Sequence, residues 1–112
     1  MKEFNEYLND NNGGVFCLVE KDYKVYKELG NVSFRKNLIT YIECNSKMRH
    51  MGNGTLLLNR VESHLKKNGY KYIFLTSIGN SEEFYIKNGY RRMNIFDHIW
   101  HMNMNNMIKY IK

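Results

Sequence analysis

Arg49-His50-Met51-Gly52-Asn53-Gly54 is the stretch that decides the fold of this chain. The strand-like residues 38–44 precede it, and the helical residues 55–68 follow it. Two glycines that flank one residue, where a strand gives way to a helix, let the backbone turn tightly with its amide groups facing outward. The first turn of a helix has N–H groups without partners and carries about half a positive charge. The sequence therefore predicts a main-chain nest for an anion such as a phosphate.

The residues behind this loop have the apolar spacing of an amphipathic helix. Leu57, Val61 and Leu65 recur at every fourth position, so one face of the helix is expected to be buried. Gly69 follows at the place where a left-handed residue commonly ends a helix. The nearly continuous apolar run 72–76 is typical of a central strand covered on both faces.

The flanking segments are assigned from periodicity and turn residues. Residues 2–9 carry Phe4, Tyr7 and Leu8 at helical spacing, which predicts a short docking helix. Three β-favouring runs joined by short polar turns predict an antiparallel meander. The meander strands are placed at 15–20, 23–29 and 38–44. A short helix begins at Asn80, with Glu83 completing a capping box, and ends at Gly89. A last strand is placed at 99–104.

The composition narrows the class of protein. A chain of 112 residues makes one domain, 1–112, with a single modest core. No apolar run approaches the roughly 20 residues that span a bilayer, and residues 1–5 lack the apolar core of a signal peptide, so a cytoplasmic protein without a membrane partner is expected. Cys17 and Cys44 fall in no metal-ligand spacing and are expected to be reduced. A net charge of +6 attracts polyanions, either nucleic acid or an anionic cofactor.

The spacing Arg49-x-x-Gly52-x-Gly54 before a helix resembles the acyl-CoA-binding motif of the GNAT N-acetyltransferase superfamily. A second match, Phe84-Tyr85-Ile86-Lys87-Asn88-Gly89-Tyr90, resembles the Phe-Tyr-x-Lys-x-Gly-Phe signature that closes the same fold. Each motif alone is common, but together and in this order they are specific, and the resemblance covers about residues 38–92. It implies an α/β fold in which a central mixed, largely antiparallel sheet has helices packed on its faces.

The resemblance also implies how the loop would serve acetyl-CoA. Main-chain N–H groups around residues 50–55 would hold the pyrophosphate. The strands before and after the loop would splay apart, and the pantetheine arm would lie in the gap beside the strand end at residues 43–45. No metal is implied. The cofactor-binding residues predicted in this way are Cys44, Asn45, Arg49, His50, Met51, Gly52, Asn53, Gly54 and Thr55.

Two side chains are predicted to take part in the chemistry. Tyr85 matches the family tyrosine whose hydroxyl protonates the departing CoA thiolate after an amine has attacked the thioester. Glu43 is the nearest carboxylate in sequence that could take the proton of the amine, and its simpler interpretation is an exposed strand charge. A main-chain N–H within residues 43–45 would stabilise the oxyanion. His98 and His101, in a predicted strand, would point to opposite faces and make poor metal ligands.

Three functions stay open. The favoured one is an N-acetyltransferase that moves an acetyl group from acetyl-CoA to a primary amine on a small molecule or a peptide. The second is a CoA-binding module without catalysis. The third and least favoured is a basic nucleic-acid-binding domain, since no recognised nucleic-acid motif accompanies Arg91 and Arg92.

The family usually carries a strand and two helices before the meander, and these help to build the wall of the acceptor site. About fourteen residues precede the meander here, so the chain is expected to be a small member with a shortened N-terminal part. Either the acceptor site is open, or a partner subunit such as a second copy completes it.

Overall fold

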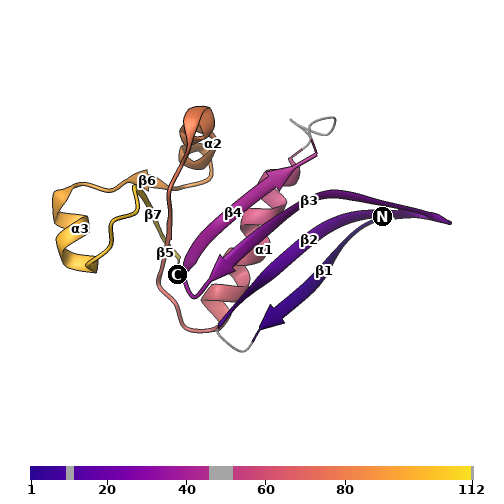
Figure 1. The fold of residues 1–112 in the computed structure, drawn as a ribbon, viewed down its shortest axis with the longest axis horizontal. Helices are drawn as coiled ribbons and strands as arrows, with labels where there is room; N and C mark the ends of the chain where they lie inside the picture. The colour runs from indigo at the N-terminus through magenta and orange to yellow at the C-terminus, as the bar shows by residue number, and fades with distance from the viewer. Residues whose placement is uncertain (10–11, 46–51, 112) are drawn as a thin grey trace.

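The computed structural model describes residues 1–9, 12–45 and 52–111. Over these residues it shows a seven-stranded sheet in the order β1-β2-β3-β4-β5-β7-β6 (Figure 1). Among the described strands β4 and β5 form the one parallel pair. The elements are β1 (Lys2–Asn9), β2 (Gly13–Asp22), β3 (Val25–Arg35), β4 (Leu38–Cys44), α1 (Asn53–Lys67), β5 (Tyr72–Leu75), η2 (Gly79–Ser81), α2 (Glu82–Lys87), β6 (Arg91–Arg92), α3 (Ile95–His101) and β7 (Met107–Tyr110). The expected mixed, largely antiparallel α/β fold is confirmed.

Strand β1 replaces the helix predicted over residues 2–9, so that prediction is wrong. β1 pairs antiparallel with β2 along its whole length. The helical spacing of its apolar residues misleads, because Phe4 packs on the core while Tyr7 and Leu8 are exposed. An eight-residue helix is marginal on its own, whereas the strand gains a hydrogen-bonded partner over its full length.

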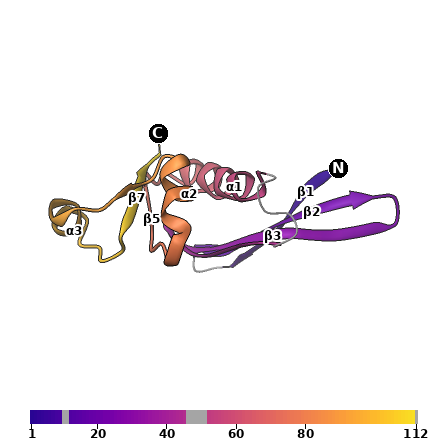
Figure 2. The same ribbon diagram turned by 90° about the horizontal axis from the view of Figure 1, so that it is seen from above.

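Strands β2, β3 and β4 form the predicted meander, with β1 added at its outer edge. Only residues 10–12 separate β1 from β2, which is too short a connection to contain a helix. The two helices that the family resemblance places before the meander therefore have no counterpart between β1 and β2. Figure 2 shows that no described helix covers the face of the meander opposite α1.

Helix α1 packs across the other face of the meander and builds most of the core (Figure 2). The predicted stripe Leu57, Val61 and Leu65 is fully buried there. Opposite it, the rings of Phe16 and Phe34 stack with centroids 5.3 Å apart. The helix predicted from sequence is therefore confirmed, with its start two residues earlier than expected.

The segment after β6 differs from its prediction. The last strand was expected at residues 99–104, but residues 95–101 form α3, and the strand that closes the sheet is β7. Asn94 caps α3 by accepting a hydrogen bond from the Asp97 N–H at 2.9 Å. This cap starts a helix, and the apolar residues behind the strand prediction form no buried face, because Ile99, Trp100 and Met102 are all exposed.

Helix α2 begins differently from its prediction but ends as expected. Asn80 lies inside η2, and Ser81 occupies the position before the helix, where its hydroxyl donates to the Ile78 carbonyl at 2.8 Å. The predicted Asn80 cap is therefore wrong, because the chain first makes a tight 3₁₀ turn. Gly69 follows α1 with φ of 89°, the left-handed conformation predicted for it, and Gly89, where α2 was expected to end, has φ of 93°.

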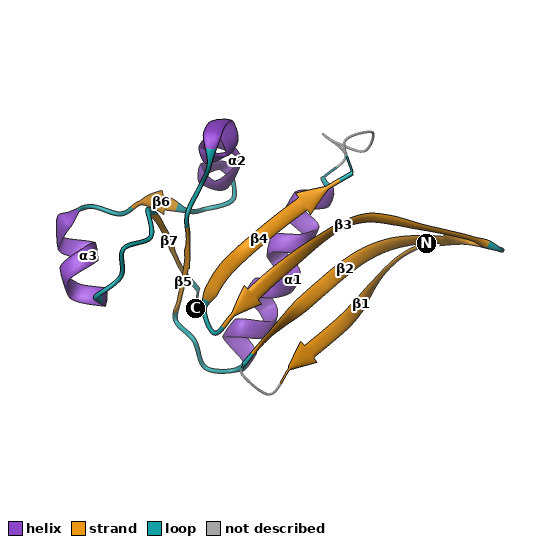
Figure 3. Ribbon diagram, in the orientation of Figure 1, coloured by secondary structure: helices purple, strands orange, loops and turns teal. Residues whose placement is uncertain are grey.

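Strands β4 and β5 pair at one end and part at the other. Their register contains Leu38 opposite Phe74 and Ile39 opposite Leu75, after which β5 ends while β4 continues to Cys44. Figure 1 shows the two strands diverging, and Figure 3 shows α2 following the free end of β5. The parting opens a gap in the middle of the sheet.

Candidate functional site

A groove of about 780 Å³ lies where β4 and β5 part. It is lined by β4, the first turn of α1, the chain that leaves β5, and the η2–α2 segment. Segments far apart in the sequence therefore meet at one concave surface. Such a place, at an irregularity of a sheet and beside a helix N-terminus, is where ligands commonly bind.

The first turn of α1 lines this groove with residues whose main-chain N–H groups lack partners within the helix. Gly52 precedes the helix in the left-handed conformation, with φ 77° and ψ 7°, and no side chain caps the helix. The first intrahelical bond runs from the Leu56 N–H to the Gly52 carbonyl at 3.1 Å, so the N–H groups of residues 53–55 have no partner within the helix. This is the geometry that binds an anion.

The two glycines of the loop have different physical roles. At Gly52 an added Cβ would meet nothing within 4 Å, so the residue serves the positive φ. At Gly54 a Cβ would lie 2.7 Å from Cζ of Phe84 and 3.6 Å from Sγ of Cys44. The second glycine therefore lets α2 pack against the start of α1, a role that the phosphate-based interpretation of the sequence missed.

Asn53 is a polar residue buried at the groove with half of its amide unsatisfied. Its side chain is 2% exposed, and its Oδ1 accepts a hydrogen bond from Nζ of Lys2 at 2.8 Å. Its Nδ2 has no hydrogen-bond partner among the described residues. Because a buried donor without a partner is costly, Asn53 is a place where the described residues leave a polar group unsatisfied beside the groove. Lys2 was missed from sequence, since nothing local signals that β1 reaches this helix end.

The main chain of β4 directs one N–H group toward the gap. The Asn45 N–H donates to the Leu29 carbonyl of β3 at 2.8 Å, so it points away from β5. Successive N–H groups of a strand point to opposite sides, which turns the Cys44 N–H toward the groove. Of the three N–H groups considered from sequence, that of Cys44 faces the groove.

Tyr85 projects from α2 into the wall of the groove. It is 6% exposed, and its ring contacts those of Phe84 and Tyr90 at centroid distances of 5.2 and 5.9 Å. Burial raises the pKa of its phenol, and the nearby Cys44 thiol raises it further. The hydroxyl is therefore held protonated at neutral pH and can donate a proton to a developing anion.

Glu43 lies on a neighbouring cleft of about 770 Å³ that is lined by the paired segments 28–31 of β3 and 41–45 at the end of β4. Its side chain is exposed and accepts a hydrogen bond from the Tyr41 hydroxyl at 2.9 Å. Tyr41 and Cys44 line both the cleft and the groove, so the two spaces adjoin.

The structure thus gathers most of the predicted site residues and separates two of them. Glu43 and Asn45 line the neighbouring cleft. Arg49, His50 and Met51 lie outside the described residues. The predicted site residues that line the groove together are Cys44, Gly52, Asn53, Gly54, Thr55 and Tyr85.

His98 and His101 make contacts within the chain that hold the structure around α3. His98 and His101 lie three residues apart on α3 and so on one side of a helix, which corrects their placement on opposite faces of a strand. Nδ1 of His98 lies 2.7 Å from the Asn103 carbonyl oxygen, and the His101 ring packs against Tyr72 at 4.6 Å. The described part of the chain contains no group of three or more side chains that could hold a metal ion. None of its helices is long and apolar enough to cross a membrane.

Comparisons with known proteins agree with this geometry. A family model described as acetyltransferase (GNAT) domain matches residues 2–107. No curated protein matches the chain. Among solved structures, a GNAT-family acetyltransferase of Staphylococcus aureus Mu50 is 19% identical with a TM-score of 0.74, covering 95% of this chain and 72% of that one. Tetrahymena GCN5 is 18% identical with a TM-score of 0.66, covering 93% and 71%.

A third solved structure has a named ligand. The N-acetylglutamate synthase of Neisseria gonorrhoeae, complexed with coenzyme A and N-acetyl-glutamate, is 14% identical with a TM-score of 0.65. The match covers 88% of this chain and 26% of that one. At these identities the likeness to solved structures is one of fold.

Proposed function

Because the chain belongs to the GNAT acetyltransferase family, we propose that it transfers an acetyl group from acetyl-CoA to a primary amine by direct attack. The observation that carries the proposal is the groove itself, where the parted strands β4 and β5, an uncapped helix N-terminus and a buried tyrosine meet. Each of these three parts supplies one requirement of the reaction: room for the pantetheine arm, a site for the pyrophosphate and a proton donor.

The start of α1 would bind the pyrophosphate of acetyl-CoA. Residues 53–55 line the groove, and their N–H groups have no partner within the helix, so the helix dipole would add to their attraction for negative charge. The complex of the gonococcal synthase with coenzyme A supports this cosubstrate for the fold.

The acetyl thioester would then lie between Cys44 and Tyr85. The amine nitrogen attacks the thioester carbonyl carbon, and the Cys44 N–H donates to the oxyanion that forms. When the intermediate collapses, the C–S bond breaks, the C–N bond of the amide remains, and the thiolate takes the phenolic proton of Tyr85. The tyrosinate regains a proton from solvent.

Glu43 is the residue that we propose as general base for the amine. It lies in the cleft that adjoins the groove at Tyr41, so an acceptor seated in that cleft would lie between the carboxylate and the thioester. The proton would pass to the carboxylate directly or through water. Residues 10–12 are too few to form a helix between β1 and β2. We therefore expect the cleft beside Glu43 to be open enough for a small amine or for a lysine of a peptide.

A binding measurement followed by a turnover measurement tests the proposal. Coenzyme A at about 100 times its dissociation constant should stabilise the fold by roughly 2.7 kcal/mol and raise the melting temperature by several degrees. A panel of primary amines with acetyl-CoA should then give free CoA in a steady-state assay. An unchanged melting curve would overturn the cosubstrate assignment, and binding without turnover would favour a CoA-binding module.

A further inference from the structure

Helix α3 stands apart from the rest of the fold. Figures 1 and 2 both place it at one end of the molecule, beyond β6 and β7 and opposite the tip of the β2–β3 hairpin. None of its residues is buried, and none belongs to the two hydrophobic core clusters. Isolated helices of seven residues are unstable in water. Other contacts must therefore hold it.

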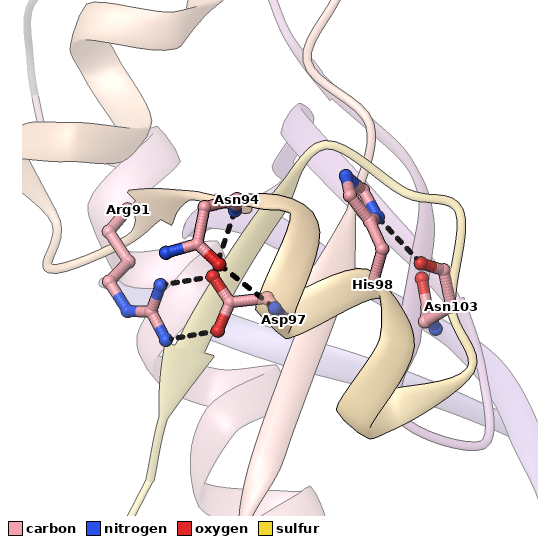
Figure 4. Close-up of polar contacts among 5 residues, drawn as sticks. All are labelled: Arg91, Asn94, Asp97, His98 and Asn103. Carbon is pink, nitrogen blue, oxygen red and sulfur yellow. Dashed lines mark hydrogen bonds and ion pairs between the residues drawn. The ribbon is translucent and has the colours of Figure 1, made fainter.

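Polar contacts on the inner side of α3 hold it in place (Figure 4). The Arg91 guanidinium donates to both carboxylate oxygens of Asp97 at 2.5 and 2.8 Å. Asp97 and Asn94 also bond each other's main-chain N–H groups, each at 2.9 Å. At the other end, His98 contacts the Asn103 carbonyl. The charged and polar side chains of α3 are thus used within the chain.

The outer side of α3 is apolar and faces water. Large apolar side chains on the helix and just after it are at least two-thirds exposed: Ile95, Phe96, Ile99, Trp100, Met102 and Met104. We call these six residues the α3 face. The four on the helix follow the i, i+1, i+4, i+5 spacing that puts them on one side. The face is an ordered apolar surface without an occupant from the described chain.

The α3 face is as large as a stable dimer needs. The two aromatic side chains present roughly 150–250 Å² each and the four aliphatic ones somewhat less, so the six together offer on the order of 800 Å². That is about what each partner contributes to a standard specific interface, and more than the roughly 300–600 Å² of the largest apolar patch on a typical monomer.

The charges around α3 disfavour an anionic partner. Arg91 pairs with Asp97, and Arg92 pairs with Glu82. Lys109 of the adjacent β7 lies 2.9 Å from Glu62. These cations are thus already neutralised, so they offer little to nucleic acid or to an acidic membrane. The α3 face is therefore a neutral zone on a chain of net charge +6, where two copies can meet with the least repulsion.

We propose that the α3 face is the interface of a two-fold homodimer of this chain. In such an interface the same patch serves both subunits, so a single apolar face supplies both sides of the contact. Trp100 and Phe96 are its central aromatic anchors, the residue types that dominate binding energy at interfaces. The proposal is independent of the acetyl transfer.

Trp100 makes the dimer directly measurable, because it is the only tryptophan of the chain. Sedimentation of the full chain from about 1 μM to about 100 μM should show mass rising toward twice 13.5 kDa. The tryptophan emission should shift to shorter wavelength over the same range, since the indole is 83% exposed in the monomer.

Trp100→Glu places like charges across the two-fold axis and should weaken association at least about tenfold. Phe96→Ser should weaken it without adding charge. Both variants should keep the wild-type circular dichroism, because neither side chain belongs to a core cluster. Tyr23→Glu, at a fully exposed aromatic residue on the β2–β3 turn, is the matched control and should dimerise as wild type does.

A chain that stays monomeric at about 100 μM with unshifted emission overturns the proposal. So does a dimer that persists in Trp100→Glu, since another surface must then form it. An emission shift that appears only with lipid vesicles would also overturn it and would assign the α3 face to a membrane surface.

Discussion

Tyr85 and Tyr90 lie five residues apart, both are buried, and their rings touch, yet their surroundings differ in kind. The Tyr90 hydroxyl donates to Glu62 at 2.9 Å, and the same carboxylate takes a hydrogen bond from Lys109. Tyr85 instead lines the groove beside Cys44. A tyrosine whose proton is held by a fixed carboxylate supports the fold, whereas one that faces a groove can pass its proton to a substrate.

The largest expected effect is that of Tyr85→Phe on catalysis. Removing the proton donor should lower kcat by about 100-fold or more, while the melting temperature changes little because the ring and its packing remain. The measurement is steady-state release of CoA with the best amine of the panel. The contrast between the two tyrosines breaks down if Tyr90→Phe slows kcat as much as Tyr85→Phe does.

Gly54→Ala should disturb the surroundings of Tyr85 and leave those of Tyr90 intact. The new methyl would lie 2.7 Å from Cζ of Phe84, so that ring must move within the groove. We expect kcat/KM for acetyl-CoA to fall about tenfold. Gly69→Ala is the control: its φ of 89° makes it strained, but its Cβ meets nothing within 4 Å, so it should lose about 1 kcal/mol of stability with KM unchanged. Equal kcat/KM values for acetyl-CoA in the two variants would contradict the packing role of Gly54.

Tyr90→Phe should act on stability and spare catalysis. It removes the hydrogen bond to Glu62 but leaves that carboxylate with Lys109, so the loss should be about 1 to 2 kcal/mol, measured by thermal unfolding. Tyr70 follows the same Lys-Asn-Gly sequence but is only half-buried, and Tyr70→Phe should change stability by less than about 0.5 kcal/mol. Equal losses in the two variants would show that the Glu62 bond contributes nothing.

Alkaline titration should give the smallest effect. Burial raises the pKa of both phenols above the ordinary value of 10.0, and at Tyr90 the Glu62 carboxylate adds to it. The unfolded chain loses the phenolic protons near pH 10, while the folded chain keeps them. The free energy of unfolding therefore falls as the pH rises past about 10, and below that pH the two phenols do not change it. Tyr90→Phe should flatten this loss in unfolding experiments. If the double variant Tyr85→Phe/Tyr90→Phe lost stability just as steeply above this pH, the two phenols would not be the cause of the loss.

Sequence patterns located α1 and β4 because each carries its own signal. Helix α1 buries one stripe and ends at a glycine, and β4 is a β-favouring run bounded by turns. Residues 2–9 and 99–104 were assigned wrongly for one physical reason: their apolar side chains do not lie on a buried face. For β1, the pairing with β2 decides the structure. For α3, the apolar side of the helix is exposed.

The site was predictable only where a motif is contiguous in sequence. The loop glycines and Tyr85 each lie within a local motif, and they line one groove. The contact of Lys2 with Asn53, and that of Phe84 with Gly54, join residues at least 30 positions apart, so periodicity and spacing could not predict them. The choice among the three N–H groups of residues 43–45 likewise depended on which side of β4 is bonded to β3.

The parting of β4 and β5 leaves a sheet whose hydrogen-bonding ladder is interrupted in the middle rather than at its rim. Exposed strand edges are normally liabilities, because any passing strand can pair with them. Here the interruption is recessed, with α2 and the start of α1 as walls, so another protein chain has little access to it. A slender molecule that carries its own amide groups could complete the ladder. Substrate capture and cohesion between the two halves of the sheet would then be a single event.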